Sequence, residues 1–342
     1  MKLHLIGARP GPIGGTTVLF EQLVIGLESN PHIQLYVTDT SKIKKVSVLD
    51  KFRYLFRSIT YCMNSEITVL NVSANGALYF GPLFLFICKL FRKKFALRMF
   101  GGVFNQTYLS YGFVKRFLVR LTISNSGITF FETDLVSSFF ESMYPDRKIV
   151  RLPNSRPISS YTCQHTNKNK FAFVGAIKRS KGVGEIIEVA KRYRETEFFF
   201  AGPVVENDLI EEINERPNCK YLGIIGPDSI HEFLVEMSCL ILPTRHFGEG
   251  HPGVILEAYS VGLPVIATKW RSVPEIIVDG TTGFLVEVDD LEQLAETIRK
   301  FELMDITERR RMGHAARDYF LSSYESCRVR DLFLRKISEI FD

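Results

Sequence analysis

Short runs of apolar and β-branched residues alternate with helical stretches along this chain, and the whole series occurs twice. Several runs are apolar almost throughout, which is typical of strands that helices cover on both faces of a parallel sheet. The pattern therefore predicts an α/β chain of two doubly wound, Rossmann-like domains. The predicted strands are Leu3–Ile6, Ile33–Val37, Ile67–Val72, Phe95–Met99, Ile128–Phe131 and Ile149–Leu152, then Phe171–Val174, Phe198–Ala201, Tyr221–Ile224, Leu240–Leu242, Val265–Ala267 and Phe284–Val286.

A polar stretch separates the two series. Residues 159–170 have little apolar content and no periodicity, and they follow a turn-forming sequence with prolines at 153 and 157. This composition predicts a linker, and 342 residues is the length of about two domains. We place the domains at residues 1–156 and 157–319. The charged segment Thr307–Ile340 is predicted to close the chain as helix.

Charge is divided unevenly between the two halves. Residues 1–156 carry 20 Lys and Arg against 9 Asp and Glu, whereas residues 157–342 carry 23 against 29. A basic half indicates an anionic partner surface. We do not expect nucleic acid as that partner, because no recognisable binding motif accompanies the charge. The six cysteines lack metal-ligand spacing and no signal peptide is apparent, so a cytoplasmic protein is expected.

One segment has the length of a membrane span. Ile67–Cys88 contains no charged residue over 22 positions. Asn71, Ser73 and Asn75 interrupt it, and Gly81-Pro82 follows. These breaks favour a buried strand, a polar turn and a short apolar helix over a span.

Two loops between a strand and a helix carry glycines. In Gly7–Thr17, Gly14 and Gly15 stand directly before a predicted amphipathic helix, where backbone amides can approach an anion. The loop contains neither a G-x-G-x-x-G fingerprint nor a P-loop, and a simple tight turn is the alternative. In Gly175–Gly182, Lys178, Arg179 and Lys181 cluster beside a helix N-terminus. Such cations oppose the helix dipole by ~0.3–1 kcal/mol, so a bound diphosphate would explain them, although solvated side chains remain the alternative.

The most informative stretch is Leu242–Pro264. Pro252 suits the first turn of a helix, Gly262 its C′ position and Pro264 the stop beyond. Glycines at 248, 250 and 253 let amides close on a phosphate group. Glu249 and Glu257 flank this helix start, and two carboxylates there suit sugar or ribose hydroxyls. Taken singly, each glutamate also has an ordinary structural explanation. One can stabilise the helix dipole from the first turn, and the other can lie on the exposed face of the helix.

This stretch resembles the retaining, nucleotide-sugar-dependent glycosyltransferases of family 4, which have the GT-B fold of two Rossmann-like domains facing a central cleft. Glu249 and Glu257 match the E-x7-E signature, inside a longer match over Phe247–Val286. Pro10–Thr16, Pro153-Asn154 and Gly175–Gly182 resemble the family's N-terminal glycine loop, its linker entry and its diphosphate loop. The resemblance covers nearly the whole chain.

The resemblance implies a donor held mainly by the second domain, with Glu249 and Lys181 as the catalytic residues. Glu257 would bind the ribose and Glu249 the transferred sugar. The acceptor would meet the first domain, and a final helix, at about 320–342, would pack back on that domain. No metal or cofactor is implied, because cations and the helix dipole stabilise the departing diphosphate. The remaining implied residues are Gly14, Gly15, Lys178, Arg179, Ile224 near the base, Gly250, His251, Pro252, Gly253 and Val254 for the donor, and Arg98, Gly101 and Gly102 for the acceptor side.

Two departures from the family pattern stand out. Ala176 replaces an arginine of the diphosphate loop, and Lys178 or Arg179 could supply the missing cation. Phe100 replaces a histidine before Gly101-Gly102. His251, Arg98 or a backbone carbonyl could then orient the sugar.

We therefore expect a retaining glycosyltransferase that moves a sugar, from a UDP-sugar by preference, to a lipid-linked oligosaccharide in bacterial surface polysaccharide assembly. Basic residues beside apolar ones suggest peripheral binding to the anionic inner face of the plasma membrane, although Leu83–Ile87 could equally be core. The alternatives are a non-catalytic sugar-nucleotide-binding protein, and a sugar-nucleotide epimerase or phosphorylase of similar build. The basic residues are Lys89, Arg92, Lys93 and Lys94 after Leu83–Ile87, and Lys115, Arg116 and Arg120 in an aromatic helix.

Overall fold

The computed structural model describes residues 1–11, 15–41, 47–164 and 169–341. The chain divides into two compact units, each with its own sheet. Unit 1 comprises Met1–Ser155 together with Ser326–Asp342, and unit 2 comprises Arg156–Glu325. The last helix of the chain thus belongs to the unit in which the chain begins.

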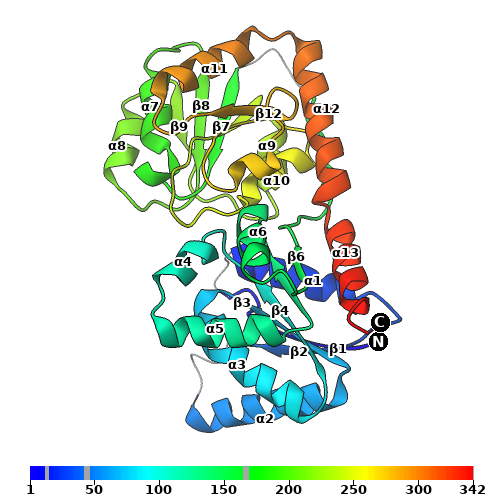
Figure 1. The fold of residues 1–342 in the computed structure, drawn as a ribbon. Coiled ribbons are helices and arrows are strands. Elements are labelled where there is room, and N and C mark those ends of the chain that lie inside the picture. Colours follow the sequence, from blue (N-terminus) through cyan, green and yellow to red (C-terminus); the bar gives the residue numbers. More distant parts are fainter. Residues whose placement is uncertain (12–14, 42–46, 165–168, 342) are drawn as a thin grey trace. The chain divides into compact units, whose positions relative to one another are not determined.

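Unit 1 is built on a six-stranded parallel sheet in the order β2-β1-β3-β4-β5-β6 (Figure 1). Its apolar side chains form two cores. One lies between the sheet and helices α1 and α13, and the other contains buried residues of α3, α5 and α6. The elements are β1 (Lys2–Gly7), α1 (Gly15–Glu28), β2 (Gln34–Asp39), α2 (Val48–Asn64), β3 (Ile67–Val72), α3 (Ala74–Leu90), β4 (Lys94–Met99), α4 (Phe104–Ser110), α5 (Phe113–Asn125), β5 (Ile128–Phe131), α6 (Asp134–Met143), β6 (Ile149–Arg151) and α13 (Ser326–Ser338).

Unit 2 contains the second parallel sheet, in the order β12-β11-β10-β7-β8-β9. A single core cluster of buried residues joins this sheet to its helices. The elements are β7 (Lys170–Val174), η2 (Arg179–Lys181), α7 (Val183–Ala190), β8 (Glu197–Ala201), α8 (Asp208–Asn214), β9 (Cys219–Tyr221), α9 (Ile230–Val235), β10 (Cys239–Leu242), α10 (Gly253–Ser260), β11 (Val265–Thr268), η3 (Val273–Ile276), β12 (Gly283–Val286), α11 (Leu291–Leu303) and α12 (Ile306–Ser323).

The two parallel sheets confirm the predicted doubly wound class, and most predicted strands lie within a residue of the observed ones. The run Tyr221–Ile224 is an exception, because β9 spans Cys219–Tyr221. Gly223 follows with φ +78°, in the left-handed region, and such a residue cannot continue a strand. Leu222 and Ile224 therefore belong to a loop, and the prediction of a strand there is wrong.

The closing segment is two helices rather than one. Between α12 and α13, Tyr324 is fully buried and leaves helical geometry at φ −129°. Its backbone carbonyl accepts a hydrogen bond from the amide of Arg156, and Arg156 forms a β-bridge with Glu325. The chain thus leaves unit 2 beside the point where it enters it. Helix α13 then packs against α1 in unit 1 (Figure 1).

The segment Ile67–Cys88 forms the buried strand β3 and most of helix α3, so the predicted strand and helix are both present. The helix is not short as predicted, because Asn75, Gly81 and Pro82 lie inside its 17 residues and do not end it. Within the described ranges, no helix combines the length and the apolar character that crossing a bilayer requires.

Candidate functional site

Helix α10 presents its first turn at the carboxyl end of the unit 2 sheet. Pro252 caps it in extended conformation, and Gly262 follows its last turn with φ +78°. Ile255, Leu256 and Tyr259 are fully buried, so packing fixes the helix in place. The first amide groups of such a helix have no carbonyl partner within it and carry partial positive charge. The sequence prediction for this helix is correct to within one residue at its start.

Glu249 is a buried carboxylate just before α10. Its Oε2 accepts hydrogen bonds from Lys181 Nζ at 2.5 Å and from Thr244 Oγ1 at 2.9 Å. The glutamate side chain is 8% exposed and the lysine side chain 18% exposed. Oε1 makes no hydrogen bond to any residue in the described part of the chain. One carboxylate oxygen is therefore fixed, while the other can accept a ligand hydroxyl.

Lys181 reaches this position because two loops approach closely. Gly182 has φ +86°, and a Cβ atom there would collide with the carbonyl oxygen of Pro243. Only glycine permits both that backbone angle and that contact. The approach seats the loop of η2 against the end of β10, and it brings Lys181 to Glu249.

Glu257, in the second turn of α10, pairs with a residue that the sequence analysis did not select. Arg156 Nε lies 2.8 Å from Glu257 Oε1, and the two side chains are 12% and 22% exposed. A Cβ atom on Gly253 would collide with the guanidinium, so Arg156 lies directly over the first residue of α10. This places a cation at the end of the helix where an anion is favoured. The only sequence signal was its position beside Pro153-Asn154, which the resemblance had already marked.

His251 is held inside unit 2 by neighbours on other elements. Its Nε2 lies 2.8 Å from Glu275 Oε2, and its ring meets Tyr324 edge to face at 6.3 Å. The side chain is fully buried. These contacts tie the loop before α10 to η3, so the histidine has a structural anchoring role beyond its predicted place in the site.

Lys178 lies close to His246, with 3.3 Å between Nζ and Nδ1. Burial, and then the charges of Lys178 and Lys181, lower the pKa of His246. The ring is consequently neutral at neutral pH and adds no positive charge. Of the two lysines in this loop, Lys181 pairs with Glu249 just before α10, whereas Lys178 lies beside His246.

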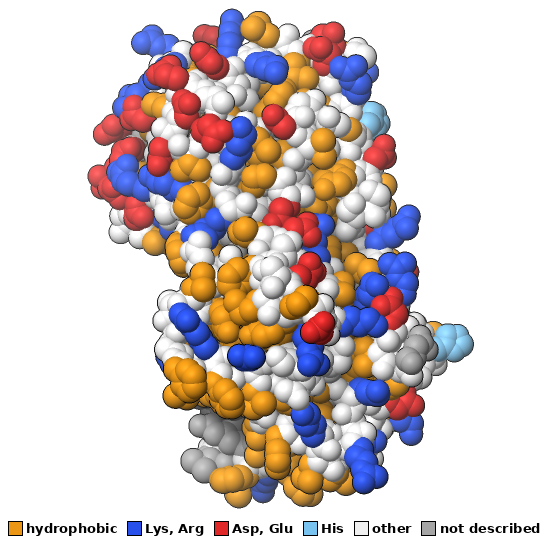
Figure 2. Space-filling view, in the orientation of Figure 1, with side chains coloured by type: hydrophobic (Ala, Val, Ile, Leu, Met, Phe, Trp, Pro, Cys, Tyr) orange, Lys and Arg blue, Asp and Glu red, His pale blue; other side chains and the backbone are white. Residues whose placement is uncertain are grey.

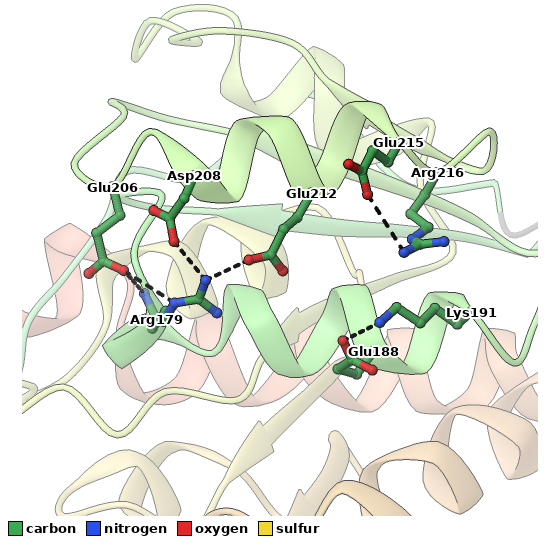
Figure 3. A network of polar contacts seen from close by, with 8 residues as sticks. All are labelled: Arg179, Glu188, Lys191, Glu206, Asp208, Glu212, Glu215 and Arg216. Carbon is green, nitrogen blue, oxygen red and sulfur yellow. Dashed lines mark hydrogen bonds and ion pairs between the residues drawn. The ribbon is translucent and has the colours of Figure 1, made fainter.

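Arg179 is directed elsewhere. Its Nη2 lies 2.7 Å from Asp208 Oδ2 and 2.5 Å from Glu212 Oε1, and its amide donates to Glu206 (Figure 3). Hydrogen bonds to Asp208 and Glu212 raise the pKa of the guanidinium. The structure therefore does not bring Arg179 to Glu249 and Glu257, and the suggestion that it replaces the arginine missing at Ala176 is corrected here. The acidic residues beside it come from the loop after β8 and from α8.

The other predicted residues fall in three places. Ile224 is 72% exposed in the loop after β9. Gly14 lies outside the described residues, and Gly15 begins α1 in unit 1. Gly101 follows β4 with φ +111°, and its amide donates to Glu132 Oε2 at 3.0 Å; Gly102 comes next. Arg98, within β4, is buried in the same unit.

A comparison with protein families and known proteins bears on this site. Residues 162–319 match the family "Glycosyl transferases group 1". An uncharacterised 41.2 kDa protein in the cps region of Klebsiella pneumoniae is 33% identical over 38% of this chain and 36% of its own length. The capsular polysaccharide biosynthesis glycosyltransferase CapM of Staphylococcus aureus is 29% identical over 45% of this chain and 42% of its own length. The matches thus span less than half of these relatives.

Among solved structures, HepE of Anabaena in complex with UDP superposes with a TM-score of 0.78. The alignment covers 99% of this chain and 100% of HepE, at 12% identity. This likeness confirms the GT-B class, with two Rossmann-like domains of six parallel strands each. The match of residues 162–319 supports a group 1 glycosyl transferase, a coarser description than the predicted family 4.

Proposed function

We propose that this chain is a retaining, family 4-like glycosyltransferase. It would move a sugar from a nucleotide sugar, with UDP as the preferred nucleotide, to a lipid-linked oligosaccharide in bacterial surface polysaccharide assembly. The observation that carries the proposal is the pair of ion pairs around the start of α10, Lys181 with Glu249 and Arg156 with Glu257. Both pairs are largely buried, and both carboxylates belong to the E-x7-E spacing.

The donor roles follow from what each group can offer. The Oε1 of Glu249 accepts hydroxyls of the transferred sugar, while Lys181 and the backbone N–H groups of Gly250, His251, Gly253 and Val254 meet the diphosphate. Glu257 accepts the ribose hydroxyls. Oriented cations and amides in a buried site stabilise the negative charge that develops on the leaving diphosphate. In this scheme the leaving phosphate takes the acceptor proton, and the acceptor attacks the face that the diphosphate leaves.

Arg156 supplies the cation that Ala176 lacks. Its guanidinium lies over Gly253, where a diphosphate seated on the helix start would meet it. A phosphate group, like a carboxylate, can accept two parallel hydrogen bonds from a guanidinium. We expect Arg156 to exchange Glu257 for the diphosphate when the donor binds, which releases Glu257 for the ribose.

The comparisons support the polysaccharide part of the proposal. CapM is named for capsular polysaccharide biosynthesis, and the Klebsiella relative is placed in a cps region. The solved HepE structure contains UDP, which favours a UDP-sugar as donor.

A lipid-linked acceptor is supported by the surface of α5. Phe113, Val114 and Phe117 are 85%, 66% and 53% exposed, and Lys115 and Arg116 stand between Val114 and Phe117. On the visible face of unit 1, apolar side chains gather beside lysines and arginines (Figure 2). An apolar face next to basic residues suits the interface of an anionic bilayer, at ~1 kcal/mol per basic residue. In α3, Phe84, Leu85 and Ile87 are core, while Phe86 and Leu90 are exposed.

Three experiments test the proposal. In a thermal-shift screen of nucleotide sugars, a donor at 100 times its Kd should stabilise the chain by ~2.7 kcal/mol. If no nucleotide sugar raises the melting temperature, the donor assignment is refuted. Product analysis with a bound donor separates sugar transfer from epimerisation and phosphorolysis. In a co-sedimentation assay, the chain should bind vesicles that contain anionic lipid more strongly than neutral vesicles. Equal binding to both kinds of vesicle would refute the proposed binding to an anionic membrane.

A further inference from the structure

Unit 1 has a basic pocket of about 500 Å³ at the amino ends of β4, β5 and β6. Four segments surround it: the end of α3 with the start of β4, the turn between α5 and β5, the residues before β6, and the residues after α13. Ligands of parallel α/β sheets bind beyond the carboxyl ends of the strands, so this pocket lies at the opposite edge from the expected acceptor side. Its basic residues are Lys89, Lys93, Lys94, Arg147 and Lys148.

The charge of this pocket is not balanced by its acidic residue. Glu339 is the one carboxylate among the described residues that line it. Its Oε1 lies 2.9 Å from the Nζ of Lys336, which does not line the pocket, and its Oε2 lies 3.4 Å from Lys148 Nζ. Lys89 donates to the neutral amide oxygen of Asn125 at 2.5 Å. Two lysines therefore share the single negative charge, and the other four cations of the pocket pair with no carboxylate in the described part of the chain.

Helix ends explain only part of this cluster. The pocket lies beside the last residues of α3, α5 and α13, and a cation near a helix C-terminus stabilises it by ~0.3–1 kcal/mol. Lys148 has such a role, because its Nζ donates to the carbonyl of Glu339 at 2.9 Å. No hydrogen bond or ion pair to a described residue is formed by the side chains of Lys93, Lys94 and Arg147. These three cations repel one another, and a bound anion would remove that cost.

A phosphate monoester is the anion that best fits these groups. At pH 7 it carries about −1.5 to −2 charges and three acceptor oxygens, so several cationic side chains can contact it at once. A carboxylate offers one charge and two oxygens. Lysine binds phosphate as a point charge, and the planar guanidinium of arginine can donate two parallel hydrogen bonds to it. The mixture of lysines and an arginine in one pocket therefore favours phosphate.

The outer face of α3 indicates the source of such a phosphate. Leu83, Phe86 and Leu90 are 39%, 66% and 64% exposed. Their spacing of three and four residues places them on one face of the helix. Leu90 directly follows Lys89, so this apolar face reaches the pocket. Exposed apolar side chains next to a cluster of cations suit the boundary between the headgroups and the acyl chains of a bilayer.

We propose that this pocket binds a phosphate monoester, and that this phosphate is the headgroup of an anionic phospholipid. The inference refines the proposed membrane partner, because one pocket replaces a general attraction to negative charge. It rests on the proposed function only for the lipid as the source of the phosphate. The two descriptions differ at Arg92, which is exposed next to Lys93 but does not line the pocket. A general attraction depends on both residues equally, whereas the pocket depends on Lys93.

The first test is a calorimetric titration with inorganic phosphate at low salt, where screening is weak. It compares the full unmodified chain with Lys93→Gln and with the matched control Arg92→Gln. We expect Lys93→Gln to weaken phosphate binding about tenfold, as for loss of one hydrogen bond to a charged group, and Arg92→Gln to leave it unchanged. Phosphate bound at the start of α10 would be affected by neither substitution, so the difference between the variants reports on the pocket.

A thermal melt separates binding from folding. The Lys93 side chain forms no hydrogen bond or ion pair with the described residues, so Lys93→Gln should melt at the same temperature as the unmodified chain, or higher. Should it melt at a lower temperature, Arg147→Gln removes a cation from another loop of the same pocket. Phosphate binding that is unchanged in a stable Arg147→Gln would overturn the proposal.

The second test uses phosphatidylcholine vesicles that contain either phosphatidic acid or phosphatidylglycerol, at equal surface charge. Phosphatidic acid presents a phosphate monoester, whereas phosphatidylglycerol presents a diester. The unmodified chain should bind the vesicles with phosphatidic acid more tightly. This preference should be lost in Lys93→Gln and kept in Arg92→Gln.

Each result decides a separate part of the proposal. If the two variants bind phosphate alike, whether unchanged or equally weakened, the pocket is refuted. If phosphate binding depends on Lys93 but both anionic vesicles bind equally, the phosphate belongs to a free compound and the lipid source is refuted. Failure of the proposed membrane partner differs from both. The chain would then bind anionic and neutral vesicles equally, while the phosphate titration would still report on the pocket.

Discussion

Replacing Arg156 with methionine should weaken the binding of the diphosphate of UDP without weakening the binding of its uridine. In the ligand-free chain the variant breaks a largely buried ion pair and leaves Glu257 unpaired. The carboxylate is 22% exposed and can partly recover water, so we take the low end for a lost charge-assisted hydrogen bond, about 1.5–2 kcal/mol. At about 2–4 °C per kcal/mol, the melting temperature should fall by roughly 3–8 °C.

The ligand experiment compares UDP with uridine by calorimetry. Loss of one charge-assisted contact to the diphosphate should weaken UDP about tenfold or more. Uridine has no phosphate that could lose a contact. In the variant, the carboxylate of Glu257 is no longer paired with Arg156 and can accept the ribose hydroxyls. It should therefore bind as tightly as to the unmodified chain, or more tightly.

The control is Arg192→Met, which breaks a solvent-exposed arginine–glutamate pair with Glu292. An exposed pair contributes about 0–1 kcal/mol, so stability and both affinities should stay nearly unchanged. If UDP and uridine weaken equally in Arg156→Met, the arginine acts only by shaping the site. If neither weakens, the assignment of Arg156 to the diphosphate is refuted.

Three further predictions concern other parts of the chain. Glu249→Gln should retain UDP binding and reduce transfer by about 100-fold or more, as for other oriented transition-state contacts, and normal turnover would contradict its catalytic role. Gly182→Ala should lower stability by about 1–3 kcal/mol and weaken UDP, because it forces φ +86° and a collision on the loop that carries Lys181; unchanged melting would refute this. His4 is buried, and burial lowers its pKa from 6.5 to about 3. Below pH 6.5 the unfolded chain binds a proton at this histidine that the folded chain does not. The free energy of unfolding should therefore decrease by ~1.4 kcal/mol for each pH unit as the pH is lowered from 6.5 towards 3. In urea unfolding across this pH range, the free energy of unfolding should depend less steeply on pH in His4→Gln than in the unmodified chain. The same slope in both would disprove the contribution of His4.

The sheets could be predicted because a buried strand has a local signal, a short run of apolar residues. Apolar runs such as Val265–Ala267 lie on fully buried strands, and the proline and glycine around α10 mark its ends wherever the helix packs. The run Tyr221–Ile224 misled because an apolar sequence does not reveal that Gly223 adopts a left-handed angle. Local pattern therefore predicts elements well and their last residues less well.

Side-chain partners could not be predicted, because they depend on contacts between distant segments. Arg179 stands among cations in the sequence, yet its partners Asp208 and Glu212 come from α8, about thirty residues later. Arg156 lies in the turn-forming sequence just before the predicted linker, and its partner Glu257 is 101 residues away. The charge of each residue was visible in the sequence, but the direction of its side chain was not.

The proposed scheme requires an acidic half to hold an acidic donor, and the pairing of charges in unit 2 allows it. Arg179 is neutralised by acidic side chains away from α10, and the site itself contains two cations, Lys181 and Arg156, already paired with Glu249 and Glu257. With these pairs intact, the amides of the first turn of α10 still carry partial positive charge. A diphosphate then competes with carboxylates for the same cations, while its sugar and ribose hydroxyls hydrogen-bond to the carboxylates. In this scheme, the cations exchange their carboxylate partners for phosphate oxygens, and the carboxylates gain ligand hydroxyls as partners. A ligand that carries both phosphates and hydroxyls should therefore bind more tightly than expected from the separate affinities of its two parts.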